Sequence, residues 1–210
     1  MTAERADKEH VLLVCTANVT RSPTAEYLLR TALDVEACSR LHIHSVGTKA
    51  VDGIALDPRM EPFLARDGIT DTTGHRSRRL QTAHLSSATL ILTMESTHRS
   101  QVVGLDRSSR SRAFTLTEFA RLAAGVTGAR NLTVGSLADL VRVFDRFRSS
   151  GAAAIGDESI ADPHGRSRWA YRRAYRSMRD ALHPVVALLN AAAPGWREST
   201  QAPSTRIRPD

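Results

Sequence analysis

The sequence predicts an α/β fold with a short, mostly parallel sheet covered by helices on both faces. Three segments of strand length, residues 10–14, 41–47 and 88–94, are apolar or alternate between apolar and polar residues. Each is followed by a segment with helical character. A fourth strand, residues 112–116, and a closing helix, residues 166–189, complete the alternation. Because parallel strands require crossover connections, this order favours a parallel sheet.

The first strand leads directly into the stretch CTANVTRSP, residues 15–23. The preceding run HVLLV has the length and the branched residues of a buried parallel strand. The following TAEYLLR is helical in character, with Ser22 as the expected N-cap and Pro23 as the expected first helical residue. A strand, a short loop and a helix N-terminus form an anion site, because unpaired N–H groups and the helix dipole converge on the loop.

Cys15 and Arg21 stand at the two ends of this loop and suit attack of a thiolate on phosphorus. A helix N-terminus and a nearby cation both stabilise a thiolate. Arg21 can hold two oxygens of a tetrahedral anion through its planar fork, which lysine lacks. Ser22 can donate to the thiolate, and Asn18 tolerates the left-handed backbone of a tight loop. The Cys-x5-Arg spacing alone also fits an inert buried thiol, but the flanking strand and the Ser-Pro pair favour catalysis.

The stretch resembles the signature of the low-molecular-weight protein tyrosine phosphatases, in which an apolar strand enters Cys-x-x-Asn-x-x-Arg-Ser-Pro near the N-terminus. The late pair Asp162-Pro163 resembles the Asp-Pro that supplies the general acid in that family. The resemblance spans roughly residues 9–192 and implies a four-stranded core, with Cys15 as nucleophile, Arg21 as phosphate ligand and no cofactor or metal. The loop residues and the residues expected to support them are Thr16, Ala17, Asn18, Val19, Thr20, Ser22, Ser45 and His75.

Two of these supporting residues lie far from the loop in the sequence, and their roles are implied only by the resemblance. Ser45 lies near the end of the predicted second strand and is expected to brace Asn18, and His75 matches a family histidine linked to the loop. His42 and His44 share one face of the same strand. Because no further ligand follows at a metal-binding spacing, we expect these two side chains to be exposed to solvent, and we expect no metal site.

The remaining segments predict further helices and one insertion. Helices are expected from Asp57 through Arg66, closed by Gly68, and from residue 95 to residue 103. An insertion of about residues 120–158 departs from the family pattern and contains an amphipathic helix.

That amphipathic helix is expected at residues 136–147, and the residues GAAA at 151–154 predict a flexible approach to the acid loop. The insertion is interpreted as a lid, a partner surface or a tolerated surface addition. The chain is therefore predicted to form one domain, residues 1–192, and a disordered tail, residues 193–210.

Composition restricts the function classes. The net charge of +7 comes almost wholly from arginine, and no nucleic-acid motif accompanies it, so nucleic-acid binding is not expected. No apolar stretch approaches the roughly 20 residues of a membrane span, and the polar start is no signal peptide. The two cysteines, Cys15 and Cys38, make no disulfide framework, which favours a reducing, cytoplasmic location.

The expected reaction is hydrolysis of a phosphomonoester on a protein through a phosphocysteine intermediate, with phosphotyrosine as the first substrate class. Relatives that take phosphotyrosine line the cleft rim with aromatic residues, but the matching positions here are Val51, His164 and Gly165. A relative that dephosphorylates arginine has a threonine after the loop asparagine, whereas this chain has Val19, as the tyrosine enzymes do. Protein arginine phosphatase activity is therefore the first alternative.

Two further alternatives remain from the sequence. Arsenate reduction would need additional thiols, but Thr20 replaces the second loop cysteine of many relatives, which leaves only Cys38. A silent phosphate-binding protein is disfavoured because Cys15 and Asp162 are both present. If Asp162 were not the proton donor, Asp157 would be the next candidate.

Overall fold

The computed structural model describes residues 8–127, 134–149 and 159–196. A four-stranded sheet in the order β2-β1-β3-β4 lies at its centre, and each neighbouring pair is parallel. The strands are β1 (Glu9–Cys15), β2 (Leu41–Gly47), β3 (Leu90–Thr93) and β4 (Ala113–Thr115). The predicted α/β class and the four predicted strands are confirmed.

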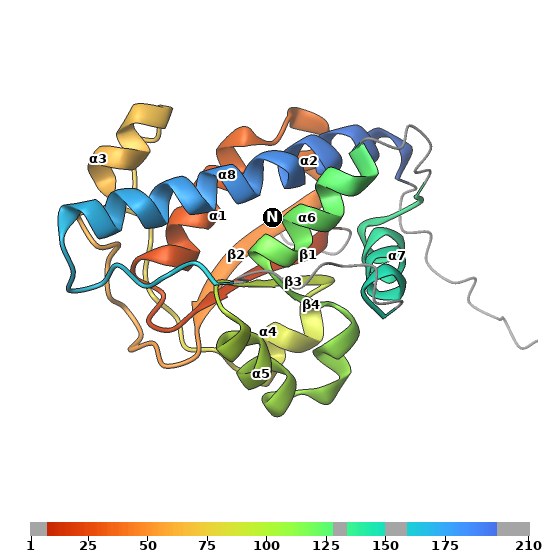
Figure 1. The fold of residues 1–210 in the computed structure, drawn as a ribbon, viewed down its shortest axis with the longest axis horizontal. Coiled ribbons are helices and arrows are strands. Elements are labelled where there is room, and N and C mark those ends of the chain that lie inside the picture. The colour runs from red at the N-terminus through yellow and green to blue at the C-terminus, as the bar shows by residue number, and fades with distance from the viewer. Residues whose placement is uncertain (1–7, 128–133, 150–158, 197–210) are drawn as a thin grey trace, which may run out of the picture.

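Helices cover both faces of the sheet (Figure 1). One face packs against α1, α6 and α8, and the other against α4 and α5. Sequence periodicity did not predict α2 and α4, because six residues complete fewer than two helical turns. The helices are α1 (Arg21–Ala32), α2 (Val35–Arg40), α3 (Glu61–Leu64), α4 (Thr82–Ser87), α5 (Ser96–Leu105), α6 (Leu116–Thr127), α7 (Leu137–Ser149) and α8 (Arg168–Ala192).

Strand β1 occupies a central position and is buried on both faces. Val11 and Leu13 pack into the larger core beneath α1, α6 and α8, while Leu12 and Val14 pack into the smaller core beneath α4 and α5. All four are fully buried, and each such side chain stabilises the fold by about 1.5–3 kcal/mol. This packing fixes the carboxyl end of β1, where Cys15 lies.

Two helix starts differ from the sequence prediction. Helix α1 begins at Arg21, so the prediction of Ser22 as N-cap is wrong: its hydroxyl lies within the first turn and contacts the Cys15 thiol. The helix predicted from Asp57 is much shorter, because residues 57–60 form turns and only Glu61–Leu64 is α-helical. The predicted end at Gly68 is confirmed by its left-handed φ of 80°.

The structure describes two parts of the segment predicted as an insertion, residues 120–127 and 134–149, and each part contains helix. Its first residues belong to α6, where Phe119 and Ala123 are fully buried in the larger core. The amphipathic helix is confirmed as α7, with Leu140 and Phe144 buried. Residues 151–154 and Asp157 lie outside the described residues.

The expected disordered tail begins later than predicted. A 3-10 turn at Ala193–Gly195 continues α8, and Trp196 is 5 % exposed within the larger core. The prediction of disorder is therefore wrong for residues 193–196, because the indole ring supplies apolar area that the core buries. Residues 197–210 lie beyond the described part of the chain.

The expectation that both strand histidines face solvent is also wrong. His44 is only 6 % exposed, and His42 is half-buried. The parallel register pairs His42 with His10 on β1, so a third histidine joins the same face. Sequence spacing did not predict this neighbour, because the register between two strands is set by the whole fold.

Candidate active site

Two hydrogen-bonding groups, from the loop after β1 and from the first turn of α1, contact the thiol of Cys15. The sulfur lies 3.0 Å from the Ser22 hydroxyl oxygen, and the backbone N–H of Asn18 donates to it over 3.3 Å. Cys15 is 2 % exposed, so these groups act in a largely desolvated setting. A thiolate at this position would therefore be stabilised by both groups.

Asn18 holds the loop in shape. Its φ of 55° is the only left-handed φ of a non-glycine residue among those described. Its side-chain NH2 group donates to Ser22 over 3.0 Å and to Ser45 over 2.8 Å, and its Oδ1 accepts from the backbone of Arg78 over 2.8 Å. The Nε2 of His75 lies 2.8 Å from its carbonyl oxygen. Thus the structure brings Ser45 and His75 to the loop residue that the resemblance assigned to them.

His75 acts here as a neutral donor. Burial lowers the pKa of His75 despite the hydrogen bond to Asn18, which raises it. Because the carbonyl oxygen of Asn18 can only accept, the proton resides on Nε2. The ring therefore fixes the Asn18 backbone without adding a charge beneath the loop of residues 16–20, which is the predicted phosphate-binding loop.

Arg21 is almost fully buried, at 1 % exposed, and its guanidinium is held from several sides. It forms an ion pair with Glu95 and donates to Asp162 over 2.8 Å and to the carbonyl oxygen of Ile160 over 2.9 Å. A further contact joins it to the Thr16 hydroxyl at 3.3 Å. The guanidinium is thereby held between the loop residue Thr16 and the acid loop that carries Ile160 and Asp162.

The loop that contains Asp162 is anchored to the sheet. Ile160 is 1 % exposed, and its backbone N–H donates to the Met94 carbonyl oxygen, just beyond β3, over 2.8 Å. The Asp162 side chain remains 40 % exposed, and its Oδ1 accepts from the backbone of His164 over 3.1 Å. One carboxylate oxygen thus faces the phosphate-binding loop from a position open to solvent.

Sequence reasoning missed two residues of this site. Glu95 pairs with Arg21, and the Nε2 of His98 lies 2.8 Å from the Thr16 hydroxyl. Burial and the positive charge of Arg21 lower the pKa of His98 to about 4. Burial tends to raise the pKa of Glu95, but the hydrogen bond and charge of Arg21 hold it below its usual value. Their place just after β3 was an available signal, because parallel sheets bind ligands at the carboxyl ends of their strands.

The three predicted rim positions are solvent-exposed. Val51 is 71 % exposed, and the His164 side chain is 59 % exposed with its Nδ1 3.5 Å from an oxygen of Asp57. The same carboxylate accepts from the hydroxyl of Tyr171 over 2.6 Å. Gly165 has a left-handed φ of 73°. All three predicted rim positions are therefore occupied by exposed residues without an aromatic carbocycle.

Gly47, at the end of β2, lets the phosphate-binding loop approach the sheet. A Cβ atom at this position would lie 2.6 Å from the carbonyl oxygen of Thr16 and 2.8 Å from the backbone nitrogen of Asn18. Both are main-chain atoms of the loop, so neither can turn aside as a flexible side chain would. Only glycine therefore fits this close approach.

We expect Gly47→Ala to lower kcat by at least about tenfold, because the loop must shift away from Cys15. Overpacking of this kind also destabilises a fold by about 1–3 kcal/mol. Steady-state kinetics and thermal unfolding would measure both effects. Gly104→Ala is the matched control, since a Cβ there would meet nothing within 4 Å. Unchanged kcat in Gly47→Ala would contradict this account of the loop.

Comparison with known proteins points to one family. The family model described as "Low molecular weight phosphotyrosine protein phosphatase" matches residues 10–128, more than half of the chain. The chain belongs to the low molecular weight phosphotyrosine protein phosphatase family. Because this family is one of cysteine-based phosphatases, the predicted family and class of reaction are confirmed.

Individual relatives of this family include both tyrosine and arginine phosphatases. The low molecular weight protein-tyrosine-phosphatase Ptp of Acinetobacter johnsonii is 33 % identical over 45 % of this chain, and the match spans 62 % of that protein. The protein-arginine-phosphatase of Geobacillus stearothermophilus is 31 % identical over 52 % of this chain and 70 % of its own length. The structure of the YwlE arginine phosphatase from the same organism matches with a TM-score of 0.63 and 26 % identity, over 87 % of this chain and 94 % of that one.

Two further findings bear on the predicted partners and boundaries. Among the described residues, no helix is both long and apolar enough to cross a membrane. The family match ends at residue 128, within the segment predicted as an insertion. Helix α7 therefore lies beyond the matched residues.

Proposed function

We propose that this family member hydrolyses phosphotyrosine on proteins through a phosphocysteine intermediate. The observation that supports it best is the loop geometry, in which the Asn18 N–H and the Ser22 hydroxyl contact the sulfur of Cys15 while the buried Arg21 contacts Thr16 of the same loop. In the first step the thiolate attacks phosphorus, an S–P bond forms, and the P–O bond to the leaving group breaks. Arg21 and the loop N–H groups stabilise the charge on the phosphoryl oxygens.

Asp162 supplies the proton for the leaving oxygen. Its carboxylate contacts Arg21 at 2.8 Å, so a phosphoryl group held by Arg21 would replace that contact. The carboxyl group would then face the leaving oxygen, which lies on the side opposite to the sulfur in an in-line displacement. In the second step Asp162 takes a proton from the attacking water, and the S–P bond breaks. The reaction needs no metal, because Arg21 and the loop amides supply the positive field.

Protein arginine phosphatase activity is the second candidate, and one comparison and one structural feature favour it. The Geobacillus stearothermophilus arginine phosphatase matches this chain in both sequence and structure. The exposed rim residues Val51 and His164 also offer less stacking to a tyrosine ring than aromatic residues would. In favour of tyrosine, Val19 stands at the loop position where the resemblance places a threonine in the arginine enzyme.

The deciding experiment compares kcat/KM for matched peptides that carry phosphotyrosine or phosphoarginine at the same position. We expect phosphotyrosine to be preferred by at least about tenfold. The Val19→Thr variant should shift the ratio toward phosphoarginine, which ties the preference to the loop. A wild-type preference for phosphoarginine would replace the first proposal with the second.

The other two alternatives receive less support. Internal disulfide relay in arsenate reduction would require Cys38 near Cys15, but Cys38 on α2 precedes β2, at the opposite end of the sheet. Six residue steps along β1, from Glu9 to Cys15, span about 20 Å between the two ends of the sheet. This is far beyond the roughly 7 Å limit between the Cα atoms of disulfide-linked cysteines. A silent phosphate-binding protein would show no turnover of p-nitrophenyl phosphate, which a single assay decides.

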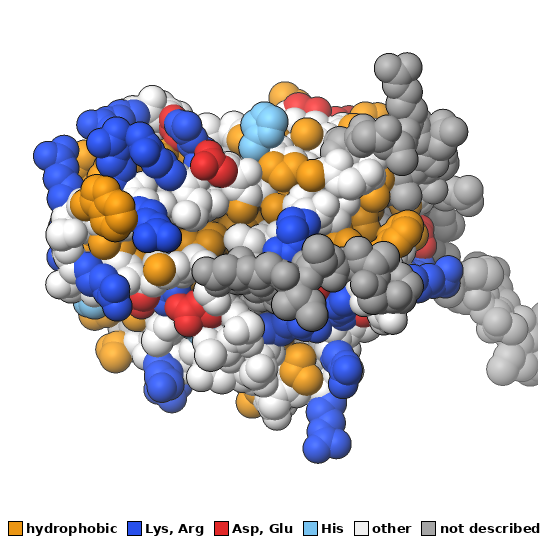
Figure 2. All heavy atoms as spheres, in the orientation of Figure 1, with side chains coloured by type: hydrophobic (Ala, Val, Ile, Leu, Met, Phe, Trp, Pro, Cys, Tyr) orange, Lys and Arg blue, Asp and Glu red, His pale blue; other side chains and the backbone are white. Residues whose placement is uncertain are grey.

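The partner that we propose is an acidic phosphorylated protein in the cytoplasm. The first three turns of α8 present exposed arginines on the surface next to the acid loop, at the left of the view in Figure 2. Trp169 lies among them, 67 % exposed, with the guanidinium of Arg173 5.6 Å from the centre of its ring. We call this surface the α8 basic face; its arginines are Arg168, Arg172, Arg173, Arg176 and Arg179.

Reversing charge on the α8 basic face should weaken substrate binding and leave the chemistry intact. We expect Arg172→Glu combined with Arg176→Glu to raise KM for an acidic phosphopeptide roughly three- to tenfold, the effect of losing two exposed ion pairs. The kcat should stay within about twofold, and the KM difference should shrink at high salt. Arg142→Glu combined with Arg146→Glu, at two exposed positions of α7, is the charge-matched control. Equal KM values in all three proteins would remove this face from substrate binding.

A further inference from the structure

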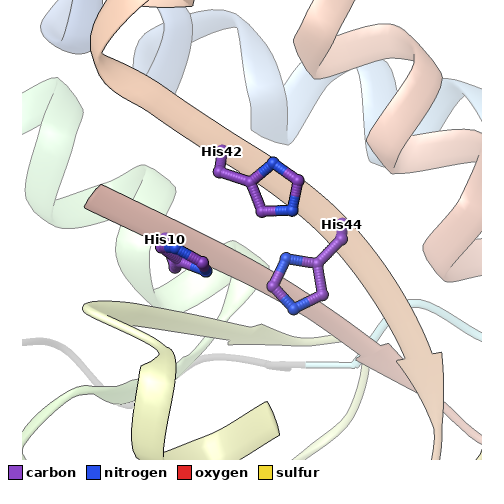
Figure 3. A group of neighbouring side chains, drawn as sticks. All are labelled: His10, His42 and His44. Carbon is purple, nitrogen blue, oxygen red and sulfur yellow. The ribbon is translucent and has the colours of Figure 1, made fainter. Parts of the chain in front are cut away.

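Three histidines meet on the face of the sheet that α4 and α5 cover, at the strand ends opposite to Cys15 (Figure 3). His10 on β1 and His42 on β2 are paired in the parallel register, and His44 follows two residues along β2. Residues two apart on a strand share one face, so all three side chains project to the same side. One ring nitrogen from each lies within 4.8 Å of the other two.

Two of these rings contain a buried nitrogen without a hydrogen-bond partner. His44 is 6 % exposed, and its Nδ1 has no partner; the Nδ1 of His10 is likewise buried and unpartnered. Burying a polar atom without a partner is unfavourable. The three ring centres lie 4.9–5.8 Å apart, and Figure 3 shows the rings converging on a common space between the two strands.

Burial and nearby charges act on the ionisation of the cluster. Burial, followed by the neighbouring His42 and Arg78, lowers the pKa of His44 to about 3, and burial lowers the pKa of His10. These two rings are therefore neutral at neutral pH, the form in which imidazole binds metals.

We propose that His10, His42 and His44 form a site for a divalent transition metal, with Zn²⁺ as the ion that fits best. Imidazole ligands suit zinc, whereas magnesium and calcium prefer oxygen. Zn–N bonds of about 2.0–2.1 Å in a tetrahedron set the ligand nitrogens about 3.3 Å apart. In this structure the ligand nitrogens lie within 4.8 Å of one another, so each pair must move closer by at most about 1.5 Å. Small rotations of the rings can supply this movement. Three histidines leave the fourth position to water.

The site would join β1 to the edge strand β2 and take no direct part in the phosphatase reaction. Cys15 follows His10 by five residue steps along β1, which corresponds to about 16 Å. Bound zinc would therefore stabilise the folded state, since the unfolded chain does not hold the three rings together. This inference does not depend on the proposed function.

The test uses the full chain with Cys15→Ser and Cys38→Ser, because thiolates would otherwise compete for zinc. We expect equilibrium dialysis to show saturable binding of one Zn²⁺ per chain. The midpoint temperature of thermal unfolding should rise by about 5–10 °C at a zinc concentration a hundredfold above Kd. Co²⁺ should give the intense visible bands of a tetrahedral ion. His44→Ala and the less buried His42→Gln should each weaken zinc binding at least about tenfold.

The exposed His183 on α8 provides the matched control, and His183→Ala should bind zinc as the parent does. If His44→Ala proved unstable, His42→Gln would still decide the question, because that ring is half-buried. The proposal would be overturned by the absence of saturable binding in the parent. Equal loss in His42→Gln and His183→Ala would overturn it too, since zinc would then bind histidines without regard to the cluster.

Discussion

Replacement of Cys15 by serine is expected to reduce turnover by on the order of a thousandfold or more. A serine hydroxyl is not ionised near neutral pH, and neither the Asn18 N–H nor the Ser22 hydroxyl can take its proton. The loop should nonetheless keep its affinity for phosphate, because Arg21 and the loop amides remain. Kinetics with p-nitrophenyl phosphate and titration with inorganic phosphate or vanadate would measure the two effects separately.

Arg21→Lys is the companion variant for this prediction. We expect turnover to fall by about a hundredfold or more, because the ammonium group of lysine cannot bind two phosphoryl oxygens as the planar guanidinium does. The substitution also alters the buried ion pair with Glu95. Cys38→Ser is the matched control, since the Cys38 thiol lies on α2 and donates to the carbonyl oxygens of Arg30 and Leu33, away from the loop. Wild-type rates in Cys15→Ser would exclude Cys15 as the nucleophile.

Asp162→Asn should slow turnover by about a hundred- to ten-thousandfold, the usual range for general acid catalysis. The loss should be larger for alkyl phosphates than for p-nitrophenyl phosphate, because p-nitrophenolate is stable enough to leave without a proton. The ratio of kcat/KM for the two substrates, in wild type and variant, measures this difference. The amide keeps the size of the carboxyl group, so the contact with Arg21 is changed more than the shape of the loop.

The control for this experiment is Glu36→Gln, which removes an exposed carboxylate on α2, at the end of the sheet opposite to Cys15. Its rates should match those of the wild type for both substrates. If Asp162→Asn lost the same factor with both leaving groups, Asp162 would act on Arg21 alone and another group would donate the proton.

The phosphate-binding loop could be predicted because its chemistry is contained in consecutive residues. Cys15 and Arg21 are separated by a distance that the backbone of one short loop determines, and the flanking strand and helix are evident from hydrophobic period. The strands were predicted for the same reason, since runs of buried branched residues indicate them directly. The N-cap prediction failed at Ser22 because its hydroxyl is used by Cys15 and Asn18, which local propensity does not take into account.

The amino-acid sequence alone therefore determined the class of fold and the position of the Cys15–Arg21 loop, and through the resemblance it led to the acid that we propose, Asp162. Only the tertiary structure decided which distant groups surround that loop: Glu95 is 74 residues from Arg21, and Asp162 is 141 residues away. The register of β1 against β2 likewise decided that His10 meets His42 and that Gly47 lies against the loop. Hydrophobic period predicts that a strand exists, but strand register and crossover packing arise only when all elements bury their apolar faces together.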